Sequence, residues 1–156
     1  MNPGDSPDPF SVSTPAESRN LVLTGFMGTG KTRIGREVAR RLGRPFVDMD
    51  VEIESRAGKP IPSIFAEDGE AAFRRMEAGL CQELGSQTGC IIATGGGALL
   101  DATSREAMMS GGTVVCLTSD VDEIQRRLSE GDAPRRPLLD VPDPRAEIER
   151  LLAERQ

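Results

Sequence analysis

The chain of 156 residues has 19 basic and 25 acidic side chains, a net charge of −6 and a hydrophobic fraction of 37%, which fits one globular domain. No basic run exceeds two residues and the only aromatic residues are five Phe, so a nucleic-acid partner is not expected. Three cysteines without a C-x-x-C pair, and no histidine, exclude a disulfide framework, a zinc site and histidine catalysis, and they predict a reducing, cytoplasmic location.

The N-terminal segment 1–19 contains four prolines and lacks an apolar stretch of signal-peptide length, so we expect a flexible leader there. No apolar run approaches the roughly 20 residues that a membrane-spanning helix needs. We therefore expect one domain over 20–156 that makes no membrane contact.

Short apolar segments alternate with amphipathic ones from Asn20 onward. The apolar segments predict buried parallel strands at 21–24, 46–50, 90–94 and 113–118. The amphipathic segments predict helices at 33–43, 68–84, 101–110, 120–130 and 143–156. This alternation predicts βαβ units in a three-layer α/β sandwich with a central parallel sheet.

Two segments interrupt the alternation. Residues 57–70 combine turn residues with a short helical pattern, and residues 129–144 are rich in Pro, Asp and Arg without periodicity. We expect the second to be a mobile surface loop, and either segment can cover a ligand.

The stretch "LVLTGFMGTGKTRIG" contains a phosphate-binding motif. Gly25, Gly30, Lys31 and Thr32 match G-x-x-x-x-G-K-[ST], and the match follows a predicted strand and opens a predicted helix. Such a loop turns backbone N–H groups toward the phosphates, while the lysine reaches the β and γ oxygens and the threonine hydroxyl holds Mg²⁺. The alternative is a plain Gly-rich turn, and the motif does not identify an acceptor.

Asp48 and Asp50 end the second predicted strand. On a strand, side chains at i and i+2 face the same side about 7 Å apart. At the carboxyl edge of a parallel sheet, Asp48 can hold a water on Mg²⁺ and Asp50 can accept a proton from an acceptor hydroxyl. Two turn or N-cap carboxylates are the alternative.

Three further groups suit an acceptor site. Arg74 and Glu77 share one helix face at i, i+3, although these two residues taken alone favour a solvated surface pair. The run Gly95–Gly97 follows the third strand, where either a tight turn or a close approach to the backbone requires glycine. Arg135 and Arg136 lie in the predicted mobile loop, where an arginine can close over a γ-phosphate or stay solvated.

Taken in order, "GFMGTGKTRIG", "FVDMDVEIE", "IFAEDGEAAFRRMEAGL", "ATGGGALL" and "RRPLL" resemble the shikimate kinase family, whose fold is that of P-loop NTPases of the nucleoside monophosphate kinase type. The resemblance implies ATP and Mg²⁺ as cofactors and shikimate as substrate, and we expect a monomer. It implies nucleotide contacts from Gly28, Thr29, Gly30, Lys31, Thr32, Arg33, Arg127 and Arg136. It implies shikimate contacts from Asp50, Arg74, Gly95, Gly96 and Gly97, metal contacts from Thr32 and Asp48, and catalytic roles for Lys31, Asp50 and Arg136.

The family pattern continues beyond the last predicted helix with a further strand, an adenine-contacting loop and a helix, and this chain has no tyrosine. We therefore expect a C-terminally incomplete domain whose sheet has one strand fewer than the family's five. Two alternatives to shikimate phosphorylation follow. One is a weak or inactive nucleotide-binding module of the same fold, and the other is a related gluconate or nucleoside monophosphate kinase.

Overall fold

Four parallel strands form a single sheet in the computed structural model, which describes residues 19–130 and 139–154. The strand order is β2-β3-β1-β4, with β1 at Asn20–Gly25, β2 at Phe46–Asp48, β3 at Ile91–Ala93 and β4 at Gly112–Leu117. Leu21 and Leu23 of β1 pair with Ile91 and Ala93 of β3, so the central strands are in register. The predicted parallel sheet is confirmed.

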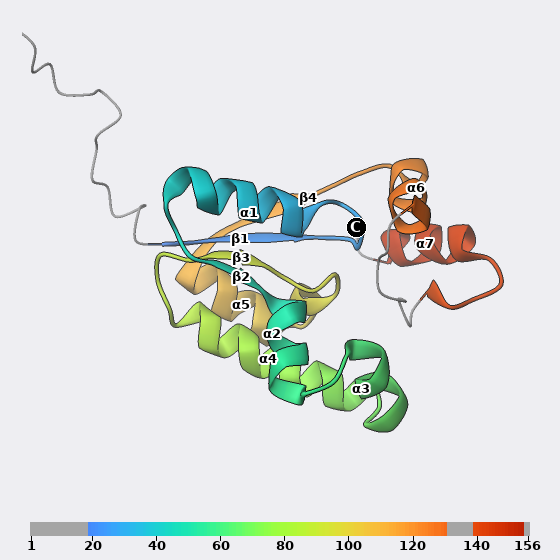
Figure 1. Ribbon diagram of the computed structural model, residues 1–156, viewed down its shortest axis with the longest axis horizontal. Helices are drawn as coiled ribbons and strands as arrows, with labels where there is room; N and C mark the ends of the chain where they lie inside the picture. Colours follow the sequence, from blue (N-terminus) through green and yellow to red (C-terminus); the bar gives the residue numbers. More distant parts are fainter. Residues whose placement is uncertain (1–18, 131–138, 155–156) are drawn as a thin grey trace, which may run out of the picture.

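The helices form layers on both faces of this sheet, as Figure 1 shows. Helix α1 (Lys31–Leu42) covers one face, whereas α4 (Glu70–Gly85) and α5 (Ala102–Gly111) cover the other. Two short helices pack on α4, namely α2 (Met49–Ala57) and α3 (Ile61–Glu67). A 3-10 turn, η2 (Ala98–Leu100), precedes α5. The expected three-layer α/β sandwich is therefore correct.

The last two described helices lie at the end of the sheet rather than on its faces. Helix α6 (Val121–Glu130) and helix α7 (Pro144–Ala153) pack against each other beyond the carboxyl end of β1 (Figure 1). They share a small apolar cluster with the loop after β1, formed by Phe26, Met27, Ile124, Ile148 and Leu151. The loop that carries the phosphate-binding motif is thus supported by α6 and α7.

The main core lies between the sheet and the α4 side. Its members include the fully buried Met49, Ile53, Ile64, Leu80 and Met108. Burying a side chain of this size stabilises a fold by about 1.5–3 kcal/mol relative to leaving it exposed. This face therefore anchors α2 and α4, the helices that carry Asp50, Arg74 and Glu77.

The predicted strand at 46–50 is wrong at its end. Strand β2 stops at Asp48, whose carboxylate accepts hydrogen bonds from the backbone N–H groups of Asp50 and Val51 at 3.0 and 3.4 Å. Asp48 is the N-cap of α2, because this arrangement satisfies N–H groups that lack a partner within the helix. Asp50 therefore lies in the first turn of a helix, and the two carboxylates are not strand neighbours.

The four-residue spacing of Ile34, Val38 and Leu42 indicates helix α1 correctly but does not mark its buried face. Ile34 and Leu42 are 40% and 57% exposed, whereas Gly35 and Ala39 are buried. The ring of Phe46 occupies the space beside Gly35, where an added Cβ would lie only 2.5 Å from a ring carbon. The absence of a side chain at Gly35 thus sets which face of α1 meets the sheet.

The structure describes all of the segment 57–70 but only part of the segment 129–144. Residues 57–70 contain the predicted short helix, α3, after a turn at Gly58. In the 129–144 segment, α6 reaches Glu130 and α7 begins at Pro144, while 131–138 lie outside the described residues. Across the described ranges, no helix is both long enough and apolar enough to cross a membrane.

Candidate functional site

The loop between β1 and α1 curls tightly because three glycines adopt conformations that other residues rarely adopt. Gly25, Gly28 and Gly30 have φ angles of 138°, 81° and 94°. At Gly25 a Cβ would also lie 2.3 Å from the carbonyl oxygen of Leu117. Both the positive φ angle and this close contact therefore require glycine at this position. No side chain caps the N-terminus of α1, which opens on this loop and favours a bound anion.

The side chain of Lys31 folds back over the loop. Its Nζ donates to the carbonyl oxygens of Gly25 and Phe26 at 2.7 and 2.9 Å. The hydroxyl of Thr29 also donates to Phe26 O, at 2.7 Å. The ammonium group therefore already lies within the curl of the loop, where phosphate oxygens can replace carbonyl oxygens as its acceptors.

A hydroxyl and a carboxylate meet beside the loop. Thr32 Oγ1 donates to Asp48 Oδ2 at 2.7 Å, while the other oxygen of Asp48 caps α2. Asp48 pairs across the sheet with Ala93, the residue before Thr94. Among the described residues, Thr94 Oγ1 is the one buried side-chain oxygen or nitrogen that lacks a hydrogen-bond partner.

These three oxygen-bearing side chains suit a hard divalent cation. No cluster of three or more His, Cys, Asp or Glu residues exists within the described part of the chain. A magnesium ion binds well to one or two protein oxygens when phosphates and waters complete its octahedral shell. Thr94 was not predicted from the sequence, although its signal was present as a hydroxyl residue directly between a buried strand and three glycines.

The predicted acceptor residues come together on the other side of the same sheet edge. Arg74 Nη1 lies 2.7 Å from Glu77 Oε2, and the exposed fractions of these side chains are 35% and 5%. The alternative of a solvated surface pair is therefore wrong. The guanidinium of Arg74 also lies 5.3 Å from the centre of the Phe73 ring, which restricts its orientation.

The glycine run after β3 fits closely against these side chains. A Cβ on Gly95 would lie 2.5 Å from Glu77 Oε1 and 3.3 Å from Asp50 Oδ1, and one on Gly97 would lie 3.2 Å from Arg74 Nη1. Asp50, Arg74 and Glu77 are thus all neighbours of this run. The prediction that the glycines permit a close approach is confirmed for Gly95 and Gly97.

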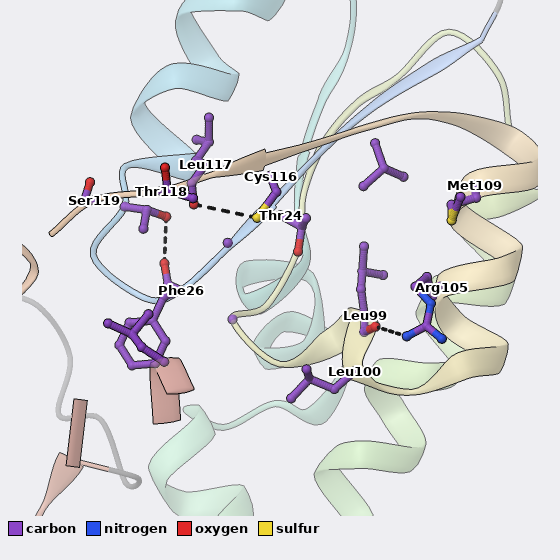
Figure 2. A pocket seen from close by; sticks show the side chains of 15 residues that line it. Thr24, Phe26, Leu99, Leu100, Arg105, Met109, Cys116, Leu117, Thr118 and Ser119 are labelled. Carbon is purple, nitrogen blue, oxygen red and sulfur yellow. Dashed lines mark hydrogen bonds between the residues drawn. The ribbon is translucent and has the colours of Figure 1, made fainter. Parts of the chain in front are cut away.

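Two cavities flank the phosphate-binding loop. The larger, of about 920 Å³, lies between α1 and α6 and is lined by Thr29, Gly30, Arg33 and Arg127, four of the predicted nucleotide residues. The smaller, of about 490 Å³, is lined mainly by apolar side chains from β4, η2 and α5 (Figure 2). Gly96 lines the smaller cavity.

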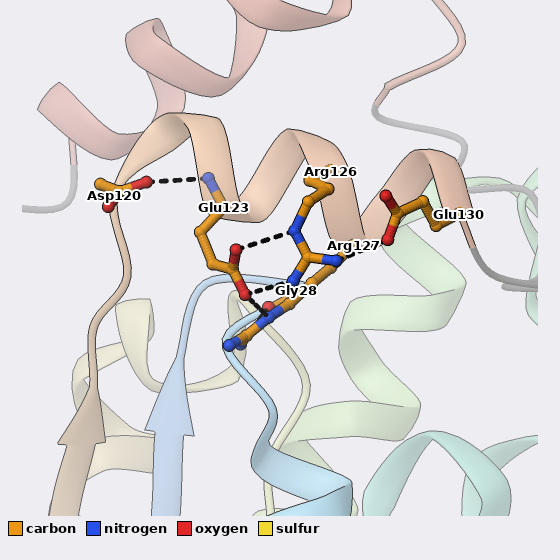
Figure 3. Close-up of polar contacts among 6 residues, drawn as sticks. All are labelled: Gly28, Asp120, Glu123, Arg126, Arg127 and Glu130. Atoms are coloured by element: carbon orange, nitrogen blue, oxygen red, sulfur yellow. Dashed lines mark hydrogen bonds and ion pairs between the residues drawn. The ribbon is translucent and has the colours of Figure 1, made fainter.

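An arginine of helix α6 forms a hydrogen bond with the backbone of the loop. Arg127 Nη1 donates to the carbonyl oxygen of Gly28 at 3.1 Å, and its Nε donates to Glu123 Oε1 at 2.6 Å (Figure 3). Hydrogen bonds from Arg126 and Arg127 lower the pKa of Glu123 to about 2, so this carboxylate is ionised at neutral pH. Arg136, the remaining predicted site residue, lies outside the described residues.

Comparisons with known proteins agree with this geometry. The family model described as shikimate kinase matches residues 27–156. A shikimate kinase of Bordetella pertussis is 46% identical over 136 residues, which are 87% of this chain and 64% of that protein. One of Symbiobacterium thermophilum is 44% identical over 137 residues, covering 88% of this chain and 79% of the relative.

A solved structure gives the same result. The shikimate kinase from Acinetobacter baumannii in complex with shikimate superposes with a TM-score of 0.84 at 41% identity, covering 90% of this chain and 77% of the other. In length, the chain spans less than two thirds of the Bordetella relative.

Proposed function

The chain belongs to the shikimate kinase family, and we propose that it transfers the γ-phosphate of ATP to the 3-hydroxyl of shikimate, releasing ADP and shikimate 3-phosphate. One observation carries the proposal. A phosphate-binding loop and an arginine–carboxylate cluster lie at the same edge of the parallel sheet, which is where ligands bind in open α/β folds.

The donor side would be the loop and the larger cavity. In this proposal, the loop from Gly28 to Arg33 binds the phosphates of ATP, and Lys31 exchanges its carbonyl acceptors for phosphate oxygens. Arg127, which lines the larger cavity, would contact the nucleotide bound there. Arg136 is proposed to contact the γ-phosphate, because a cation there lowers the cost of the charge in the transition state.

The residues near the loop fit a magnesium ion. Thr32 and Asp48 would hold it, with the buried hydroxyl of Thr94 at the same strand edge. When bound, the ion neutralises charge on the β- and γ-phosphate oxygens. Because the carboxylate of Asp48 caps α2, its position is already fixed before an ion would bind to it.

The acceptor side would be the cluster around Gly95. Shikimate carries a carboxylate and three hydroxyl groups, and a planar guanidinium binds a carboxylate through two parallel hydrogen bonds. We therefore assign the carboxylate to Arg74, oriented by Glu77, and the hydroxyls to Asp50 and the backbone of Gly95–Gly97.

In the proposed reaction, Asp50 acts as the base. The 3-hydroxyl oxygen forms a bond to the γ-phosphorus while the bond from that phosphorus to the bridging β,γ oxygen breaks. The hydroxyl proton passes to the carboxylate of Asp50, and the bridging oxygen leaves with ADP. Positioning and charge neutralisation supply most of the acceleration in such transfers, so a histidine is not required.

We also propose a cytoplasmic monomer. Cys81, Cys90 and Cys116 are free thiols in the structure, which agrees with a reducing compartment. Size-exclusion chromatography with light scattering tests the monomer directly.

The proposed function is tested by coupled measurement of ADP release with shikimate, gluconate or a nucleoside monophosphate as acceptor. Shikimate-dependent release that disappears in Asp50→Asn supports it. Release with another acceptor indicates a related kinase. ATP binding without release on any of these acceptors indicates a nucleotide-binding module.

A further inference from the structure

Helix α6 packs directly on the phosphate-binding loop. A Cβ on Gly28 would lie 3.4 Å from Leu128 Cγ and 3.5 Å from Ile124 Cγ2, so these two side chains form the floor beneath the loop. Glu123 and Arg127 lie one residue earlier along the same helix, at its edge toward the larger cavity. Glu123 and Arg127 therefore lie where α6, the loop and the larger cavity meet.

Arg127 bridges the helix and the loop through two separate hydrogen bonds. Its Nε donates to Glu123 Oε1 at 2.6 Å, and its Nη1 donates to Gly28 O at 3.1 Å (Figure 3). The same Nη1 lies 3.6 Å from the position of a Cβ on Gly30. The guanidinium is thus held over Gly28 and Gly30, two of the three glycines that curl the loop.

The bond to Gly28 fixes the direction of one peptide group. The carbonyl of Gly28 points outward to Arg127, and in a trans peptide the N–H of Thr29 then points to the opposite side, where it donates to Phe26 O at 3.3 Å. A carbonyl that turned into the loop would repel a phosphate. An arginine fixed on Gly28 O therefore helps to keep the loop receptive to an anion.

Arg127 on its own would hold this position poorly. Its side chain is 40% exposed, and a long exposed side chain samples many rotamers unless a partner restricts it. Glu123 supplies that restriction, and an exposed ion pair of this kind adds little to the stability of a fold.

We propose that Glu123 is a positioning residue for nucleotide binding, which fixes the guanidinium of Arg127 on the carbonyl of Gly28 and so raises the affinity for ATP without contacting the acceptor. The inference rests on the proposed function for the identity of the nucleotide. It assigns a role to a residue that none of the sequence motifs contains.

The helix offers a matched control. Arg126 binds both Glu123, at 2.7 Å, and Glu130, at 2.5 Å, whereas Arg127 binds Glu123. Glu123→Gln and Glu130→Gln remove the same charge from the same helix and each takes one partner from Arg126. Among the described residues, only the first removes a carboxylate that binds Arg127.

The test measures the dissociation constant of Mg·ATP by calorimetry for the wild-type chain and for both variants, with melting temperatures as a folding control. We expect Glu123→Gln to raise the dissociation constant of Mg·ATP about two- to fivefold and Glu130→Gln to leave this constant unchanged. Arg127→Lys, which retains the charge but lacks the planar fork, is expected to behave like Glu123→Gln. Equal effects of the two glutamine variants overturn the inference, because they indicate a general charge effect.

A double-mutant cycle gives a readout that a merely structural role would not produce. In an Arg127→Gln background, Glu123→Gln should cause no further loss of ATP affinity, and an additive loss contradicts the inference. The Michaelis constant for shikimate should stay unchanged in Glu123→Gln.

Failure of the proposed function is recognised separately. If the wild-type chain lacks shikimate-dependent turnover while its ATP affinity responds as expected, the function is wrong and the inference stands. If turnover occurs but Glu123→Gln binds ATP like the wild type, only the inference is wrong. A chain that does not bind ATP overturns both.

Discussion

The carboxylate of Glu77 lies against the backbone of Gly95, so closely that a Cβ on this glycine would come within 2.5 Å of Glu77 Oε1. Glu77 is a buried charge on α4, and Gly95 follows β3 at the edge of the sheet. The contact joins the helix that carries Arg74 to the strand end beside Asp50. The position of the proposed carboxylate clamp therefore depends on a residue without a side chain.

Replacing Gly95 by alanine should displace Glu77 and, with it, Arg74. The φ angle of Gly95 is not positive, so the added methyl group acts by contact and not by backbone strain. We expect the Michaelis constant for shikimate to rise about tenfold or more, since a misplaced clamp loses charge-assisted hydrogen bonds, with little change for ATP. Steady-state kinetics with each substrate varied in turn measures this.

Gly79→Ala is the control for Gly95→Ala. Gly79 lies within α4 with no atom within 4 Å of an added Cβ, so alanine should fit and raise stability by roughly 0.5–1 kcal/mol. Unchanged shikimate kinetics in both variants would show that the Gly95 contact has no part in acceptor binding.

Arg74→Ala should weaken shikimate binding far more than ATP binding. A bidentate arginine–carboxylate pair that is partly shielded from water contributes about 1.5–3 kcal/mol, which corresponds to roughly 10- to 150-fold in affinity. The neighbouring Arg75 is exposed, and Arg75→Ala should leave both constants near their wild-type values. Equal losses for the two substrates in Arg74→Ala would contradict its assignment to the acceptor.

Thr94→Val should separate stability from magnesium use. The buried hydroxyl of Thr94 has no hydrogen-bond partner among the described residues, so replacing it with a methyl group should leave the melting temperature unchanged or raise it. If the hydroxyl serves the metal–phosphate complex, the Mg²⁺ concentration for half-maximal turnover should rise several-fold. A lower melting temperature with unchanged Mg²⁺ dependence would instead indicate a structural role.

The thiols should differ in reactivity. Burial is the main cause that raises the pKa of Cys81 to about 11, whereas Cys116 is exposed on β4. At pH 8 a thiol reagent should modify Cys116 rapidly, and Cys81 should react only when the chain unfolds. Because the folded pKa of Cys81 is above the ordinary value of 9.0, its contribution to stability is complete below pH 9 and is lost as the pH rises toward 11.

The amino-acid pattern predicts the phosphate-binding loop and the succession of strands and helices along the chain well, because these depend on local features. Glycine spacing, a following lysine and a preceding apolar run are all short-range signals. The end of β2 was predicted wrongly for a related reason. "FVDMD" has the alternation of a strand, but capping by Asp48 starts a helix that the apolar pattern does not show.

Other parts of the site depend on tertiary packing. The depth at which Glu77 is buried is set by β3 and the glycine run, so a helical i, i+3 pair could equally have been solvated. The bridge from Glu123 through Arg127 to Gly28 joins residues 99 positions apart and exists because α6 packs on the loop. Neither follows from periodicity.

Mass spectrometry after incubation of the chain with Mg·ATP and shikimate shows directly whether the chain phosphorylates shikimate. We expect a singly phosphorylated product, formed with equimolar ADP and absent when Asp50 is replaced by asparagine. ATP binding with no phosphorylated shikimate, or the same product yield from Asp50→Asn as from the wild type, would contradict the proposed function.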